Sequence, residues 1–211
     1  MIQLEKTLLI GKGLHRECYR HPHDPALCVK VVYNGNQDEG RREQKYYRLL
    51  QKRNIDWRLL PRHYGTVTTD RGPGAIFDLV QDPDGSTSKT LEFYLGCEQR
   101  TRKHQSQLVQ ALADLRNYLL EQWIVTMTLK PKNIVYRRLE NGAGELVVVD
   151  NIGTSDFIPL CHYLPGFARQ KIRRKWQRFE SYMVKLFPDN AVLRDMLNQE
   201  LPELIAASAY A

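Results

Sequence analysis

The hydrophobic pattern divides the chain into a strand-rich first part and a helix-rich second part. Up to residue 80, short runs of β-branched and apolar residues alternate with turn residues, which predicts antiparallel strands. After that point apolar residues recur every three or four positions, which predicts helices. Strands followed by helices are typical of an α+β fold. We therefore predict a small antiparallel-sheet lobe at 1–80 and a reduced helical lobe at 81–211.

The first part is predicted to contain four strands and one helix. The helix is expected because Tyr46, Leu49 and Leu50 fall on one face of the segment RREQKYYRLLQKR. The expected elements, in chain order, are strands at 8–10 and 26–33, a helix that starts at Asp38 or Glu39, and strands at 62–68 and 74–80.

The second part is predicted to consist of helices with one embedded β-hairpin. Leucines at three- and four-residue spacing, ending at Trp123, give the strongest periodic signal in the chain. The hairpin is expected from strands at 133–137 and 146–149, joined by a glycine-containing turn and ending at Asp150. Two further helices are expected at 165–185 and 189–207.

Composition places the chain among ordinary globular proteins, and its positive charge is concentrated in one segment. Hydrophobic residues make up 42% and charged residues 26% of the chain. The formal net charge is +7, but residues 169–178 hold six Lys or Arg and no acid, so the rest of the chain carries only +1. This distribution argues against a protein coated with nucleic-acid-binding charge.

The basic segment has two interpretations. Ile172, Trp176, Phe179 and Met183 fall on one helical stripe, so a terminal helix could pack this stripe on the second lobe and leave its cations in water. We favour that interpretation. The alternative is docking of residues 169–178 to an anionic surface, which could be a membrane, RNA or an acidic protein.

The sequence predicts a cytoplasmic protein without a transmembrane segment. No apolar run approaches the roughly 20 residues of a membrane span. The N-terminal residues show no basic start followed by a long apolar core, so we expect no signal peptide. The four cysteines are scattered without a C-x-x-C pair, which indicates neither a zinc site nor a disulfide framework.

Five short features follow one another along the chain. Gly11 and Gly13 lie between two predicted strands, Lys30 lies within the next strand, and Glu43 lies on the helix after it. The fragments Lys130-Pro131-x-Asn133 and Asp150-x-x-Gly153 flank the predicted hairpin. Taken singly, these are consistent with a plain turn, a solvated lysine on an edge strand, a solvated glutamate, an asparagine cap and an aspartate turn.

In this order the motifs resemble the protein-kinase-like fold, from about residue 5 to about residue 157. The resemblance implies that ATP and Mg²⁺ bind in a cleft between two lobes. Gly11 and Gly13 would let backbone amides approach phosphates, and Lys30 would hold phosphates while Glu43 orients it. Asn133 and Asp150 would hold the Mg²⁺ ion.

The resemblance also assigns residues around the expected nucleotide. The segment from Phe77 through Leu79 to Gln81 would face the adenine as the strand-to-linker hinge. Arg16 stands at the third glycine position of the kinase pattern, where it could contact phosphate itself.

The residues that should carry catalysis depart from the kinase pattern. Thr128 takes the place of the catalytic aspartate, and a threonine hydroxyl is no base near neutral pH. A lost general base costs about 10²- to 10⁴-fold in rate, and Lys130 could still stabilise the transferring phosphoryl group. Asn151 and Ile152 replace a single residue before Gly153, and only 58 of the 211 residues follow that glycine.

A closer resemblance is to the YrbL family of bacteria, named for the PhoP regulatory network. Four segments carry it, namely G-x-G-x-H-R-x-C-Y at 11–19, R-R-E-x-K-Y-Y at 41–47, P-R-x-x-G-T-V at 61–67 and I-V-T-M-T-L-K-P-K-N-I followed by V-x-D-N-I-G. The resemblance implies cytoplasmic location and a role in PhoP signalling. It also makes Thr128 a family trait.

Three functions remain open at this stage. The first is a pseudokinase-type regulator whose nucleotide-bound form is read by a protein partner, which Thr128 favours. The second is a noncanonical ATP-dependent phosphotransferase acting on a small molecule. The third is an interaction module that uses the basic helix, with the nucleotide site no longer used.

Overall fold

The computed structural model describes residues 1–34, 38–153, 161 and 163–198, and these form a mixed α+β protein with two antiparallel sheets. The predicted α+β class is confirmed. The chain divides into two compact units, Met1–Thr87 and a second that begins at Ser88. The predicted lobe bounds of 1–80 and 81–211 stay a prediction. The end of the helix expected at 189–207 lies outside the described residues.

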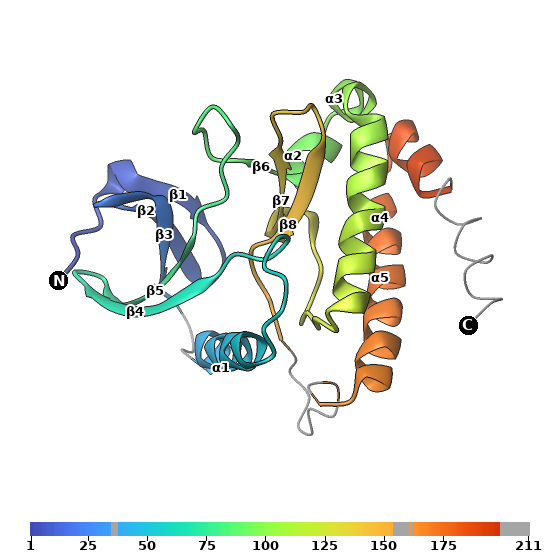
Figure 1. Cartoon of the computed structure of the whole chain (residues 1–211). Coiled ribbons are helices and arrows are strands. Elements are labelled where there is room, and N and C mark those ends of the chain that lie inside the picture. Colours follow the sequence, from blue (N-terminus) through green and yellow to red (C-terminus); the bar gives the residue numbers. More distant parts are fainter. Residues whose placement is uncertain (35–37, 154–160, 162, 199–211) are drawn as a thin grey trace. The chain divides into compact units, whose positions relative to one another are not determined.

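The first unit contains a five-stranded antiparallel sheet with the strand order β1-β2-β3-β5-β4 and one long helix (Figure 1). Its elements in chain order are the 3-10 helix η1 (Lys6–Leu8), β1 (Leu9–Lys12), β2 (Arg16–His21), β3 (Asp24–Val32), α1 (Asp38–Lys52), β4 (His63–Thr69) and β5 (Gly72–Asp78).

Strand β2 was not predicted, because its sequence RECYRH is mostly polar although one side of the strand is buried. The inward-facing residues are Glu17 and Tyr19, and a glutamate at a buried position does not read as hydrophobic. Glu17 accepts a hydrogen bond of 2.6 Å from the Tyr19 hydroxyl and pairs at 2.9 Å with Lys12. These partners let the carboxylate lie inside the unit.

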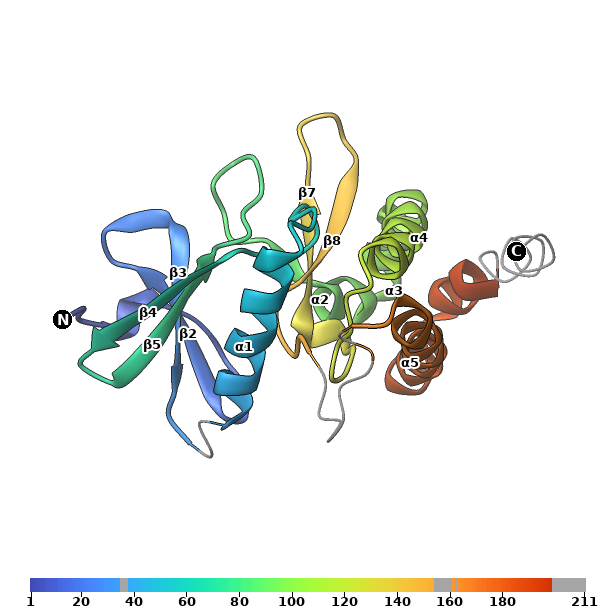
Figure 2. The ribbon, with the colours of Figure 1, turned by 60° about the horizontal axis from the view of Figure 1, so that its bottom comes forward.

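The two faces of this sheet have different roles. One face carries Tyr19, Val29 and Val31 and packs on Leu4 as a hydrophobic core. Residues directly opposite each other on antiparallel strands share a face, so Lys30 lies on the other face with Cys18. Helix α1 covers that second face, as Figure 2 shows. The residues predicted to bind phosphate therefore lie beside α1.

The second unit combines a three-stranded antiparallel sheet, of order β6-β7-β8, with helices. The predicted hairpin is confirmed as β7 and β8. The elements in chain order are β6 (Lys89–Thr90), α2 (Leu91–Leu95), α3 (Glu98–Lys103), α4 (Gln105–Glu121), the 3-10 helix η2 (Pro131–Asn133), β7 (Ile134–Arg138), β8 (Gly144–Val148), α5 (Pro165–Leu186) and the helical residues 191–198.

Two short helices and one short strand were missed, because they are too short to show periodicity. Helices α2 and α3 have five and six residues, fewer than two turns each. One local signal was present in the sequence. The Thr90 side chain caps α2 by accepting a hydrogen bond of 3.2 Å from the Phe93 amide.

The predicted apolar stripes of α4 and α5 are buried, and the two helices pack side by side (Figure 1). Ile172, Trp176, Phe179 and Met183 all lie inside, so the interpretation of α5 as a packed helix with outward cations is confirmed for this stripe. Trp123 lies beyond the end of α4, with a φ of 46°, so its inclusion in that helix was wrong. No helix in the described part of the chain is long and apolar enough to cross a membrane.

Candidate functional site

The predicted glycine loop is a tight turn between β1 and β2. The Gly13 amide donates to the Arg16 carbonyl oxygen at 2.8 Å, which closes the turn. Gly11 lies within β1, opposite Cys18. A Cβ atom at Gly11 would meet no atom within 4 Å, so the space beside this backbone is open. That openness is what a backbone contact with a phosphate group requires.

Tyr33 holds this turn in place and was missed by the sequence interpretation. Its hydroxyl donates to the carbonyl oxygens of Gly13 at 2.9 Å and Leu14 at 3.1 Å. The Lys12 ammonium lies 4.1 Å from the centre of the Tyr33 ring, in a cation–π contact. Because these partners lie about 20 residues earlier in the chain, the sequence held no local signal for them.

Glu43 is buried on α1 and pairs with Arg16 of β2. Its residue is only 1% exposed, so the alternative of a solvated glutamate is wrong. The Arg16 guanidinium donates to Oε2 of Glu43, while Oε1 has no hydrogen-bond partner within the described residues. Burying an incompletely paired carboxylate costs free energy, so the Arg16 ion pair is needed to hold Glu43 inside the unit.

Lys30 lies on β3, the central strand of the sheet, and its side chain is partly buried. The alternative of a lysine on an edge strand is therefore wrong. Its ammonium nitrogen lies 4.5 Å from the centre of the Phe77 ring. The residue opposite Lys30 on β2 is Cys18, and Arg16 lies two positions earlier on the same face. The sheet thus brings two cations to the face that Glu43 approaches. The pairing of Lys30 with Glu43 stays a prediction.

Two cysteine thiols lie close to Lys30 on this face. The Cys28 thiol donates to the Asp78 carbonyl oxygen at 3.7 Å, and the neighbouring Cys18 thiol together with burial raises the pKa of Cys28 well above its ordinary value. Cys28 therefore stays protonated near neutral pH and acts as a small apolar residue beside Lys30.

The segment predicted to face adenine has its first side chain buried in an aromatic cluster. The Phe77 ring lies 5.3 Å from that of Tyr47 and 5.0 Å from that of His63. The Leu79 amide donates to the Ala26 carbonyl oxygen at 2.7 Å. The Gln81 side-chain amide donates to the Gly85 carbonyl oxygen at 2.9 Å, which closes a small turn. A contact of this segment with adenine stays a prediction.

His63 gives the first unit a predictable pH dependence. Burial in the aromatic cluster lowers the pKa of His63, and the nearby Arg48 and Lys30 charges lower it further. The unfolded state therefore binds the proton more tightly, so stability is full above the unfolded pKa of about 6.5 and falls as the pH drops through the folded value. We expect wild type to lose more unfolding free energy than His63→Phe between pH 7.5 and pH 5 in denaturant titrations. Identical losses in both proteins would contradict this assignment.

In the second unit, the fold brings the two predicted metal ligands to the base of one hairpin. The Val149 amide donates to the Asn133 carbonyl oxygen at 2.9 Å, directly before Asp150. The Asn133 amide donates to the Lys130 carbonyl oxygen at 2.9 Å, within a 3-10 turn that begins at Pro131. Asn133 is buried and Asp150 is partly buried. A side-chain amide and a carboxylate therefore come from two backbone segments that are hydrogen-bonded to each other.

A second contact aligns the segment around Thr128 with the segment around Asp150. Thr126 and Ile152 form an antiparallel bridge. The Met127 amide donates to the Asn151 carbonyl oxygen at 2.7 Å, and the Gly153 amide donates to the Val125 carbonyl oxygen at 2.8 Å. Thr128 follows this bridge and is exposed. The segment around Thr128 and the segment around Asp150 are thus neighbours in this unit.

Two of the three residues after Asp150 have left-handed backbone conformations. Asn151 has a φ of 63° and Gly153 a φ of 111°, and both values lie in the left-handed region. Asparagine and glycine tolerate this region better than other residues. The Asn151 amide also donates to Oδ1 of Asp150 at 2.9 Å, which holds the carboxylate at the turn.

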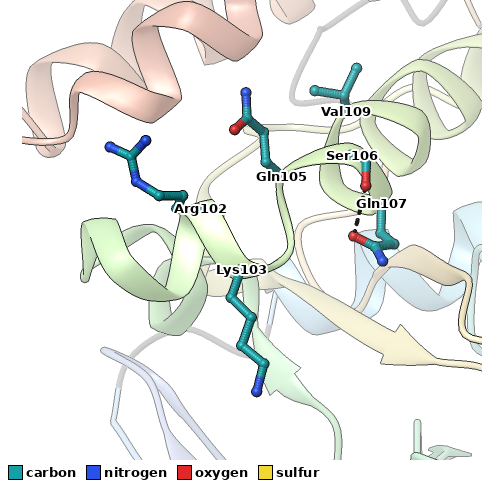
Figure 3. A pocket seen from close by; sticks show the side chains of 6 residues that line it. All are labelled: Arg102, Lys103, Gln105, Ser106, Gln107 and Val109. Carbon is teal, nitrogen blue, oxygen red and sulfur yellow. Dashed lines mark hydrogen bonds between the residues drawn. The ribbon is translucent and has the colours of Figure 1, made fainter.

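One surface pocket of the second unit contains none of the predicted site residues. It has a volume of about 540 Å³, lies where α3 meets α4, and is lined by Arg102, Lys103, Gln105, Ser106, Gln107 and Val109. Figure 3 shows that the Arg102 and Lys103 side chains point away from each other. Arg102 is engaged by Glu98 at 2.8 Å. The Ser106 hydroxyl donates to the Gln107 side-chain oxygen at 3.1 Å within the pocket lining.

No cluster of three or more His, Cys, Asp and Glu side chains able to hold a metal ion occurs among the residues that the structure describes. Asn133 and Asp150 could hold a Mg²⁺ ion together with phosphate oxygens and water, as Mg²⁺ is bound in many nucleotide sites.

Comparison with known proteins gives two results that agree. A family model described as PhoP regulatory network protein YrbL matches residues 2–183. The chain is 44% identical over 183 residues to the protein named "Uncharacterized protein YrbL" in Escherichia coli (strain K12), covering 85% of this chain and 86% of that protein. The protein of the same name from Shigella flexneri gives the same identity and coverage.

Proposed function

This chain belongs to the PhoP regulatory network protein YrbL family, and we propose that it acts there as a kinase-like regulator that binds a magnesium nucleotide. The first unit would correspond to the sheet lobe of a kinase-like fold and the second to its helical lobe. The observation that carries the proposal is the backbone pairing in the second unit that brings Asn133 next to Asp150.

The first unit supplies the groups that a nucleotide phosphate needs. Lys30 and Arg16 project from one face of the sheet, and Glu43 fixes the Arg16 guanidinium by an ion pair. A guanidinium held by a buried carboxylate is a preorganised phosphate ligand. The open backbone at Gly11 adds room for a phosphate oxygen. In this proposal Arg16 takes over part of the role that the kinase pattern gives to Lys30.

The second unit supplies oxygen ligands for the metal. Asn133 and Asp150 offer an amide oxygen and a carboxylate, the ligand types that Mg²⁺ prefers. A bound Mg²⁺ ion would supply neutralisation of phosphate charge at this position. Asn133 is held by two backbone hydrogen bonds and the Asp150 carboxylate by the Asn151 amide, so little ordering is needed when the ion binds.

Thr128 favours regulation over catalysis. It is exposed beside the bridged segment, at the position where the kinase pattern has its base, and its hydroxyl cannot accept a proton near neutral pH. Lys175 donates a hydrogen bond to the Met127 carbonyl oxygen and so holds this segment from α5. This segment is therefore held in place and offers no general base at Thr128. It favours a protein whose nucleotide-bound conformation is recognised by a protein partner over an enzyme that transfers a phosphoryl group.

The proposal is tested by calorimetric titration of ATP into wild type and two variants, each with and without Mg²⁺. Lys30→Ala removes a charge-assisted contact of about 1.5–3 kcal/mol, so we expect at least about tenfold weaker binding. Asp150→Ala is expected to remove the effect of Mg²⁺ on affinity. The matched control is Lys45→Ala, an exposed lysine on α1, which should bind ATP as wild type does. Equal affinities in all four proteins would contradict the assignment of the site.

A further inference from the structure

Helix α5 carries an unusual excess of positive charge on its outside. Its single acid is Glu180, which is partly buried and accepts a hydrogen bond of 2.7 Å from Nε1 of Trp176. The exposed part of the helix therefore carries no carboxylate. Its seven basic residues are Arg169, Lys171, Arg173, Arg174, Lys175, Arg178 and Lys185.

Four of these cations lie in one line along the helix. Residues three and four apart are neighbours on a helix surface. The spacings four, three, four, four and three define what we call the basic stripe, which consists of Phe167, Lys171, Arg174, Arg178, Tyr182 and Lys185. From Lys171 to Lys185 the stripe extends over about 21 Å. It lies on a different face from the buried residues of α5.

Exposed hydrophobic residues gather at both ends of the same helix. Eleven large hydrophobic side chains are exposed in the described part of the chain, and five of them lie between residues 163 and 186. Tyr163, Leu164 and Phe167 are at the beginning of α5, and Tyr182 and Leu186 are at its end. Water-exposed aromatic and leucine side chains beside a row of cations are a feature of membrane-surface segments.

We propose that the basic stripe is a docking surface for a bilayer that contains anionic phospholipids. Clusters of four or more cations on a helix attract the negative surface of such a bilayer, and the terminal aromatic and leucine residues fit its interfacial region. The apolar face of α5 is already buried in the protein, so the helix lies on the bilayer without inserting deeply. Nucleic acid would satisfy the cations but not Leu164 and Leu186.

The test is co-sedimentation of the full chain with vesicles of phosphatidylcholine containing about 30% phosphatidylglycerol. We expect binding to these vesicles and none to pure phosphatidylcholine. Arg174→Glu together with Arg178→Glu should weaken binding by about 100-fold, because each lost cation contributes about fivefold and each added carboxylate repels the surface. Raising the salt from about 0.1 M to about 1 M should release wild type, since the screening length falls from about 10 Å to about 3 Å.

The matched control is Arg48→Glu together with Lys52→Glu on α1, which makes the same charge change at the same spacing on another exposed helix surface. The control is expected to bind as wild type does. Equal loss in both double variants would mean that only net charge matters, and it would overturn the docking surface. So would retention of vesicle binding by the α5 variant, or binding of wild type to a single-stranded RNA oligonucleotide with no binding to the vesicles. Circular dichroism of each variant confirms that it is folded.

Discussion

Replacing Arg16 with methionine is expected to lower the free energy of unfolding by about 3 kcal/mol, because it leaves a buried carboxylate without its partner. Glu43 is almost fully buried, and its Oε1 already lacks a partner among the described residues. The Arg16 ion pair to Oε2 is therefore the main compensation for burying this charge. Denaturant unfolding followed by circular dichroism measures the loss.

The double variant separates the ion pair from simple packing. Glu43→Leu should cost less than Arg16→Met, because the Arg16 side chain is 16% exposed whereas that of Glu43 is only 2% exposed. Combining both substitutions should recover most of the loss, since replacing a buried pair by apolar residues is often neutral. The control is Arg42→Met, an exposed arginine on α1, which should change stability by less than about 0.5 kcal/mol. If Arg16→Met cost no more than Arg42→Met, the ion pair would not stabilise the unit.

The second large effect is expected at Trp176. Replacing it with alanine should destabilise the second unit by about 3–5 kcal/mol, the usual cost of emptying a buried aromatic position. Trp176 is among the largest fully buried side chains and packs on Phe179 at 5.4 Å between ring centroids. Its loss also removes the donor to Glu180, whose pKa is already raised by burial.

Amide hydrogen exchange in α4 and α5 measures this effect where it occurs, because exchange reports the opening of individual elements. Gln177→Ala is the control, since Gln177 is next in sequence but exposed, and it should leave exchange unchanged. Unchanged protection of α4 and α5 in Trp176→Ala would contradict the importance of the buried stripe for this unit.

The sequence predicted best those elements whose hydrophobic pattern is long and regular. Helices α4 and α5 bury the residues that periodicity assigns to them, and the hairpin predicted from two strands and a glycine-containing turn is present as β7 and β8. Strand β2 could not be predicted in this way, because Glu17 occupies one of its buried positions and is satisfied by residues elsewhere in the chain. A charged residue can be predicted to lie inside a protein only when its hydrogen-bonding partners are known. Those partners depend on how the strands are aligned in the sheet.

The same limit applies to the candidate site. The kinase-like resemblance pairs Glu43 with Lys30, and the structure adds an ion pair of Glu43 with Arg16, which is 27 residues away in the chain. Only the pairing of β2 with β3 shows that Arg16 and Lys30 share a face of the sheet. The contacts of Tyr33 with the glycine turn are equally invisible in a single sequence. By contrast, the order and spacing of the motifs around the hairpin predicted the proximity of Asn133 to Asp150.

The central claim is that the chain binds a nucleotide together with Mg²⁺, and calorimetric titration of ATP into wild type with and without Mg²⁺ tests it most directly. The account predicts saturable binding that Mg²⁺ tightens by about tenfold or more, through the oxygen ligands of Asn133 and Asp150. It would be contradicted by the absence of binding heat at ATP concentrations of a few millimolar, since even weak nucleotide sites are occupied there (about −4 kcal/mol at a Kd of about 1 mM).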